Sequence, residues 1–250
     1  MLIHEFGNRN LPVMLLIHGV LCPWQIWEEQ ISHFQSQYHV LAVALNAHTE
    51  NEKSEFVSLE REISEIEQYC KDNSIDEIDV LCGISLGGKI AHGIWNNGNI
   101  SVKSLVLDGA PLVPCPGFAV KIMENNYLKI IHGSKSREKK TLESFKKNFL
   151  PEKYLESYLK IADFMTDDSM RNIVRAAFNG SELSGFDNKS RALFMHGSSG
   201  SEILSKMSAA RMKKIYPDTK IICFKGDSHC QKVIFEPEKW IEAVENFLKN

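Results

Sequence analysis

Short apolar runs alternate with amphipathic stretches along most of the chain. The apolar runs have the length and composition of strands that are buried on both faces, and the clearest are residues 11–17 and 102–107. Between such runs, hydrophobic residues recur three or four positions apart, as in residues 54–70, which is typical of a helix with one apolar face. This alternation predicts an α/β fold with a mostly parallel central sheet flanked by helices.

The remaining strands and helices follow from the same pattern. Further apolar runs are expected to be strands, at residues 1–6, 38–45, 79–82, 191–195 and 220–224. Amphipathic stretches predict helices at residues 23–34, 88–95 and 203–216, and a closing helix that starts near Phe235. The polar stretch 46–53 is expected to be a surface loop at the carboxyl ends of the strands, where ligands bind in folds of this kind.

A long stretch without strand character separates residue 107 from residue 191. It carries four helical patterns instead, at residues 118–131, 141–149, 151–164 and 168–178. We therefore expect residues 111–189 to form a helical cap, inserted into a core made of residues 1–110 and 190–250. The aromatic and methionine side chains of the cap suit packing onto the core, and they also suit an apolar acyl or ring pocket beneath it.

Basic residues gather in the expected cap, at 135–140 and at Lys146 and Lys147. A run of this kind is usually the solvated face of a helix. The alternative is a docking point for an acidic part of a substrate.

Composition narrows the classes of function. The 250-residue chain has a formal net charge of -3 and 43% hydrophobic residues, which predicts one large catalytic domain without a general attraction for nucleic acid. The six cysteines show neither a CxxC pair nor zinc spacing, so we expect free thiols, no metal and no cofactor. A signal segment and a membrane span are both missing from the pattern, so a cytoplasmic location is expected. The oligomeric state is left open.

The stretch from Val80 to Gly88 is the strongest candidate for chemistry. An apolar strand runs into Gly83-Ile-Ser85-Leu-Gly87 and then into a helical pattern, which is the layout of a nucleophile elbow. Ser85 is the candidate nucleophile, and the two glycines let strand and helix approach a strained serine. The N–H of Leu86, at the start of the helix, is the first candidate donor to an oxyanion. A plain turn is the alternative interpretation of this motif.

Together with this elbow, His18-Gly19 after an early strand and Gly226-Asp-Ser-His229 before the last helix occur in the order found in α/β-hydrolases. The chain resembles that superfamily, specifically serine esterases and lipases with a helical cap. The resemblance implies that His229 is the general base and that the N–H of Val20 is a second oxyanion donor.

The resemblance also places the acid of a catalytic triad on the loop after residues 191–195. The usual offset falls on Gly200, which has no carboxylate, and Glu202 is the one carboxylate in that loop. Glu202 is therefore the expected acid, displaced by a small loop insertion. Some members of the superfamily take their acid from an earlier strand end, so Asp108 is the alternative.

These residues predict hydrolysis of a small carboxylic ester, or of a thioester, through an acyl-enzyme. The expected partner is a small-molecule ester with an apolar acyl or ring group. Two alternatives remain open at this point: cleavage of an amide or a carbon–carbon bond by the same residues, and a hydrolase-like ligand-binding or signalling protein with little turnover.

Overall fold

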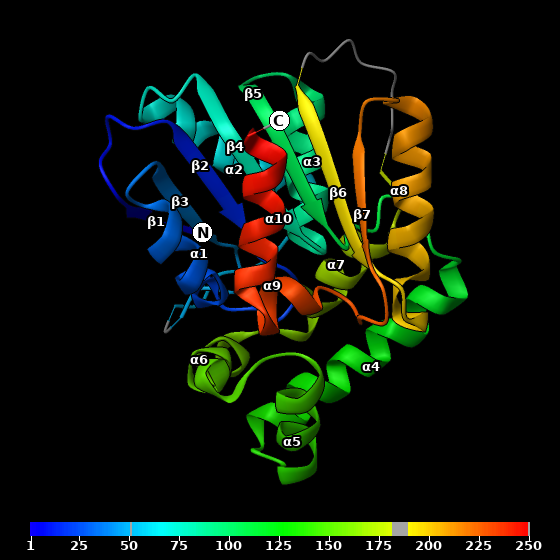
Figure 1. Ribbon diagram of the computed structural model, residues 1–250. Helices are drawn as coiled ribbons and strands as arrows, with labels where there is room; N and C mark the ends of the chain where they lie inside the picture. The colour runs from blue at the N-terminus through cyan, green and yellow to red at the C-terminus, as the bar shows by residue number, and fades with distance from the viewer. Residues whose placement is uncertain (51, 182–189, 250) are drawn as a thin grey trace.

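The central element of the fold is a seven-stranded sheet with the order β1-β3-β2-β4-β5-β6-β7 (Figure 1). The computed structural model describes residues 1–50, 52–181 and 190–249. The strands are β1 (Leu2–Phe6), β2 (Val13–Ile17), β3 (His39–Ala44), β4 (Glu77–Ile84), β5 (Ser101–Asp108), β6 (Arg191–Gly197) and β7 (Lys220–Phe224). β1 pairs antiparallel with β3, whereas all other neighbours are parallel. The sheet confirms the predicted mostly parallel α/β architecture.

Helices cover both faces of this sheet. They are η1 (Trp24–Trp27), α1 (Glu28–Phe34), α2 (Leu59–Asp72), α3 (Leu86–Asn97), η3 (Gly200–Glu202), α8 (Ile203–Ile215), α9 (Gln231–Phe235) and α10 (Pro237–Lys249). α1 and α10 lie together on one face, while α2 and α3 lie on the other (Figure 1). Because both faces are covered, the central strands carry almost continuous apolar sequences.

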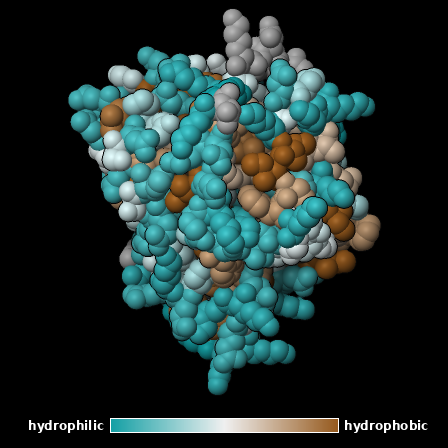
Figure 2. Space-filling model, viewed as in Figure 1, coloured by the Kyte–Doolittle hydropathy of each residue, from teal (hydrophilic) through white to brown (hydrophobic). Residues whose placement is uncertain are grey.

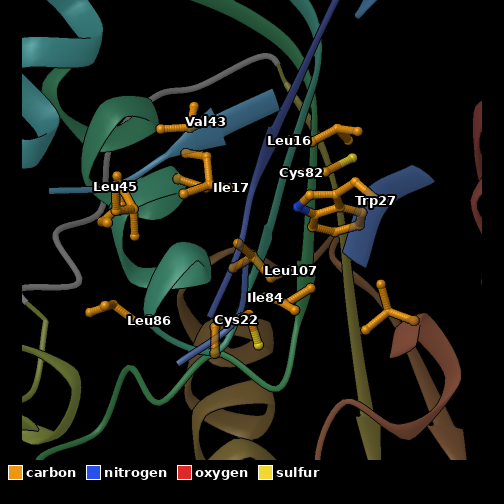
Figure 3. Close-up of a cluster of buried hydrophobic side chains, with 14 of the residues drawn as sticks. Leu16, Ile17, Cys22, Trp27, Val43, Leu45, Cys82, Ile84, Leu86 and Leu107 are labelled. Atoms are coloured by element: carbon orange, nitrogen blue, oxygen red, sulfur yellow. The ribbon is translucent and has the colours of Figure 1, made fainter. Parts of the chain in front are cut away.

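The core lies between these layers and runs through the middle strands. Figure 3 shows side chains from several strands meeting there, among them Leu16 of β2, Val43 of β3 and Leu107 of β5. All three are fully buried, and each such side chain contributes on the order of 2 kcal/mol by leaving water. The core therefore fixes the carboxyl ends of the strands, where β4 leads into α3.

Between β5 and β6, the described residues form four α-helices and one 3-10 helix, which lie beyond the carboxyl ends of the strands (Figure 1). They are α4 (Gly117–Lys135), α5 (Lys139–Asn148), η2 (Glu152–Tyr154), α6 (Leu155–Phe164) and α7 (Asp167–Phe178). Their bounds agree with the four predicted helical patterns. Residues 182–189 of the expected cap lie outside the described residues, and the division of the chain into core and cap remains a prediction.

The first half of the stretch after β3 differs from its prediction, whereas Glu52 and Lys53 are exposed as expected. Residues 46–49 are buried rather than part of a surface loop. The reason is a polar network: Glu62, fully buried on α2, accepts hydrogen bonds from the backbone and side-chain N–H groups of Asn46, each at 3.0 Å. Burial raises the pKa of Glu62 to about 7. Polar residues can be interior when every donor finds an acceptor, which composition alone does not reveal.

The surface contains mainly hydrophilic residues on the face seen in Figure 2, with hydrophobic side chains gathered over β6 and β7. A groove of about 800 Å³ lies there, and Ile221, Phe224 and Phe247 are among its lining residues. It is separate from the elbow, since neither Ser85 nor His229 lines it. Among the described residues, none of the helices has the length and hydropathy to cross a membrane.

Candidate active site

The turn from β4 into α3 holds Ser85 in a strained conformation. Ser85 has φ 50° and ψ -116°, a region that L-residues rarely occupy. A Cβ on Gly83 would lie 2.3 Å from the carbonyl oxygen of Gly87, so strand and helix meet there without room for a side chain. The N–H of Ser85 donates to the carbonyl oxygen of Asp108 at 2.9 Å, which ties the elbow to the end of β5.

The side chains of Ser85, His229 and Glu202 form one hydrogen-bonded chain. Ser85 Oγ lies 2.9 Å from His229 Nε2, and His229 Nδ1 is bonded to Glu202 Oε1. An ionised carboxylate can only accept, so Nδ1 carries the hydrogen and Nε2 is free to accept the hydrogen of Ser85. Three residues predicted from distant parts of the sequence are thus brought into the order that a triad requires.

Glu202 lies in η3, the short helix after β6, and its side chain is 1% exposed. Its second oxygen, Oε2, accepts the N–H of Gly197 at 2.9 Å, and Ser205 Oγ lies 3.4 Å from Oε1. Burial opposes ionisation of this carboxyl, but the hydrogen bond and charge of His229 and the bond from Gly197 outweigh it, so its pKa is lowered. Glu202 is thereby held as an ionised, oriented acceptor.

Asp108, the alternative acid, ends β5 near the same imidazole and makes no ion pair or hydrogen bond with it. Its side chain is buried, and within the described residues Oδ2 has no hydrogen-bond partner. Burial, followed by the charge of Glu202, raises the pKa of Asp108 to about 7. The structure therefore places Glu202 against His229 and leaves the Asp108 carboxyl out of the chain.

Two backbone N–H groups near Ser85 are the donors that the sequence predicts for an oxyanion. Leu86 is the first residue of α3, where an N–H has no acceptor within the helix. Val20 lines the same cavity as Ser85, and within the described residues its N–H has no acceptor. A Cβ on Gly19 would lie 3.2 Å from Ser85 Cβ, so the glycine lets this turn approach the elbow.

Two buried histidines shape the turn that contains Val20. His18 donates from Nδ1 to the carbonyl of Gly19 at 2.8 Å and accepts the N–H of Leu45 at Nε2, at 3.2 Å. His48 accepts the N–H of Leu21 at 3.1 Å. Burial lowers the pKa of His18 to about 3 and that of His48 to about 4, so both stay neutral. His18 therefore braces this turn as a neutral residue, and so does His48, for which the sequence gives no signal.

A cavity of about 830 Å³ opens above Ser85 and His229. Helices α4 and α5 and the end of α7 contribute part of its wall, and the loop and helix after β7 contribute another part. The apolar lining residues are Val20, Cys22, Ile84, Pro111, Met123, Tyr127, Phe149, Phe178, Leu204, Cys230, Ile234 and Phe235. This volume and lining suit a small organic molecule with an apolar portion.

Lys89, one turn after Ser85 on α3, is a residue of structural importance that the sequence analysis missed. It is 1% exposed, and its Nζ donates to the carbonyls of Ala176, at 2.6 Å, and Asn179, at the carboxyl end of α7. Burial lowers the pKa of Lys89 to about 8. A lysine alone in an otherwise apolar helix face is the signal that could have identified it.

Comparison with known proteins finds partial sequence similarity. A search against protein-family profiles gives no match. A mouse protein named epoxide hydrolase 4 is 33% identical over 88 residues, which cover 34% of this chain and 24% of that protein. The chain thus matches about a quarter of the length of this relative. A Haemophilus influenzae protein that carries the name esterase/lipase is 23% identical over 96% of this chain and 84% of its own length.

Structural similarity extends over nearly the whole chain. A crystal structure of a protein from Desulfitobacterium hafniense, assigned in its name to the alpha/beta hydrolase family, superposes with a TM-score of 0.78. The similarity covers 99% of this chain and 100% of that one, at 22% sequence identity. The sheet order, the elbow at the end of β4 and this superposition agree, and the chain has the α/β-hydrolase fold that its motifs predict.

Proposed function

We propose that the protein is a serine hydrolase that cleaves small carboxylic esters through an acyl-enzyme. The observation that carries the proposal is the 2.9 Å contact between Ser85 Oγ, on its strained turn, and His229 Nε2. A serine hydroxyl is a weak nucleophile unless a positioned base removes its proton. The esterase/lipase name of the Haemophilus influenzae relative supports the same reaction class.

The mechanism assigns one role to each residue. His229 takes the proton of Ser85 as Oγ attacks the ester carbonyl, and returns it to the departing alkoxide. Water then attacks the acyl-enzyme with His229 again as the base. Glu202 holds the imidazole in the correct tautomer and stabilises the imidazolium. The N–H groups of Leu86 and Val20 would bind the oxyanion, each contributing roughly 3 kcal/mol to transition-state stabilisation.

In this proposal, the cavity determines which substrates are accepted. Residues 111–189 act as the cap, and their side chains at the cavity, such as Met123 and Phe149, set the preference for acyl length. Thioesters of the same acyl groups follow the same route, with a thiolate as the leaving group.

The test combines a fluorophosphonate probe with a panel of p-nitrophenyl esters of increasing chain length. We expect covalent labelling at Ser85 and turnover that varies with acyl length. Ser85→Ala should lose both while keeping the wild-type circular dichroism spectrum. Ser199→Ala is the matched control, because the Ser199 hydroxyl bonds that of Ser201 and lies outside the cavity lining.

Three results would count against the proposal. Labelling of Ser85 without turnover of any ester would favour amide or carbon–carbon bond cleavage by the same residues. A wild-type protein that the probe does not label, or a Ser85→Ala variant with full activity, would refute the serine mechanism.

A further inference from the structure

The end of α5 contributes one wall of the cavity above Ser85. Lys147, Asn148 and Phe149 are consecutive there, and all three line the cavity. Lys147 is the one lysine or arginine among the described residues that do so. Its side chain is exposed, which places its charge at the water-filled mouth rather than in the apolar interior.

The other fixed charge of the lining is already neutralised. Glu236 binds Lys232 through Oε1, at 2.5 Å, and Lys239 through Oε2. The hydrogen bonds to these two lysines lower the pKa of Glu236 to about 2. Lys147, by contrast, has neither an ion-pair nor a hydrogen-bond partner within residues 1–50, 52–181 and 190–249. The mouth of the cavity therefore carries one uncompensated positive charge.

A position in the last turn of α5 does not by itself distinguish Lys147 from its neighbour Lys146. Lysines in the last turn of a helix are commonly there to interact with its carbonyl end. Lys146 occupies the same turn and is bonded to Glu152 at 2.9 Å, away from the cavity lining. Successive residues of a helix point about 100° apart, so the side chains of two adjacent lysines lie in different surroundings. Lys147 lines the cavity, whereas Lys146 is paired with Glu152 and does not line it.

Aromatic stacking holds this segment in place. The rings of Phe145 and Phe149, on either side of Lys147, stack with centroids 5.1 Å apart, and Phe145 stacks on Tyr158 of α6 at 3.8 Å. The hydroxyl of Tyr158 lies 2.8 Å from that of Ser134 on α4. The backbone of Lys147 is thus fixed between α4 and α6, which limits the volume that its ammonium group can sample.

We propose that Lys147 selects substrates that carry a carboxylate away from the bond that is cleaved. This inference rests on the proposed esterase function and specifies its substrate class: an ester with an apolar carbon skeleton and one anionic end. The skeleton is buried among the apolar lining residues, and the carboxylate pairs with Lys147 at the mouth. Because that pair is in contact with water, it gives selectivity of modest size that salt reduces.

The experiment compares esters that differ in one charge. Mono-p-nitrophenyl adipate and p-nitrophenyl methyl adipate differ at the far end of the acyl chain, whereas 4-acetoxybenzoate and methyl 4-acetoxybenzoate differ on the leaving group. In at least one pair, the ratio of kcat/KM for the anion to that for the neutral ester should fall about two- to fivefold in Lys147→Gln and further in Lys147→Glu. Sodium chloride should lower this ratio in the wild type, and Lys146→Gln should retain the wild-type ratio.

The outcomes separate this inference from the proposed function. The role of Lys147 would be overturned if, for both pairs, the ratio of kcat/KM for the anion to that for the neutral ester were the same in the wild type, Lys147→Gln and Lys147→Glu. Turnover of the esters in that case would still support the proposed serine hydrolase. If none of these esters is turned over, the same compounds are titrated into Ser85→Ala by calorimetry. Tighter binding of the anions that requires Lys147 would support the inference, and equal or absent binding would overturn it.

Discussion

Two carboxyl groups approach His229 from different loops, and their surroundings give them opposite properties. Glu202, after β6, is bonded to His229 Nδ1 and to the N–H of Gly197, and its pKa is lowered. Asp108, at the end of β5, is equally buried, lacks a partner for Oδ2, and has its pKa raised to about 7. Burial is common to both, so the hydrogen bonds of Glu202 and the repulsion of Asp108 by the Glu202 charge decide which carboxyl can act as an ionised acid.

Removing the charge of Glu202 should have the largest effect on turnover. Glu202→Gln would leave His229 without an ionised acceptor at Nδ1 and free to adopt the wrong tautomer. In a serine protease triad a change of this kind costs about 10⁴ in turnover, and we expect a loss of similar order in kcat for p-nitrophenyl esters. An unimpaired Glu202→Gln variant, with Asp108→Asn inactive, would reverse the two roles.

The second prediction concerns stability. A carboxyl whose pKa is raised on folding binds a proton more tightly when folded, so it destabilises the protein as pH rises from about 4 through about 7. Asp108→Asn removes that ionisation. The free energy of unfolding of Asp108→Asn minus that of the wild type should therefore increase from pH 5 to pH 8, by an amount on the order of 3 kcal/mol.

Urea unfolding at both pH values measures this difference, and ester turnover should fall far less than in Glu202→Gln. A stability difference between Asp108→Asn and the wild type that does not change with pH would contradict the assignment of a raised pKa. Glu202→Gln supplies the contrast, because a lowered pKa stabilises the folded state above the ordinary pKa of a glutamate and loses that effect in acid.

The smallest expected effect comes from Ser205. Its hydroxyl lies 3.2 Å from the carbonyl of Gly109, the residue after Asp108, and 3.4 Å from Glu202 Oε1. It thus connects the two carboxyl loops. Ser205→Ala removes the hydrogen that these two acceptors share, a contribution of about 1 kcal/mol, and should lower kcat by about two- to fivefold. A loss as large as that of Glu202→Gln would mean that Ser205 holds the loop itself in place.

Local pattern predicted the sheet and most helices, and the resemblance to α/β-hydrolases predicted the residues that meet at His229. Seven strands have apolar runs of the right length, and the motifs around Ser85, His229 and Glu202 occupy strand ends that a parallel sheet brings to one edge. The buried turn at residues 46–49 escaped prediction because its burial depends on Glu62, a partner on another element. The short helix α9 escaped as well, since its 5 residues are too few to show a helical period.

Which of two neighbouring residues has a role at the site also depends on contacts that the sequence does not reveal. Lys146 and Lys147 cannot be told apart in the sequence. In the structure, Lys146 pairs with Glu152, whereas Lys147 lines the cavity. The position of Glu202, two residues beyond the usual offset, was found because the loop offered no other carboxylate. A loop with two acids would have left the choice to the structure.

Lys89 has a mechanical consequence for how substrates could reach Ser85. Pulling α7 away from α3 would leave a buried ammonium without its two carbonyl acceptors, which is costly in a protein interior. The helix that begins at the elbow and the end of α7 should therefore move as a single rigid body. Opening of the cavity is therefore not expected to occur by separation of α7 from α3.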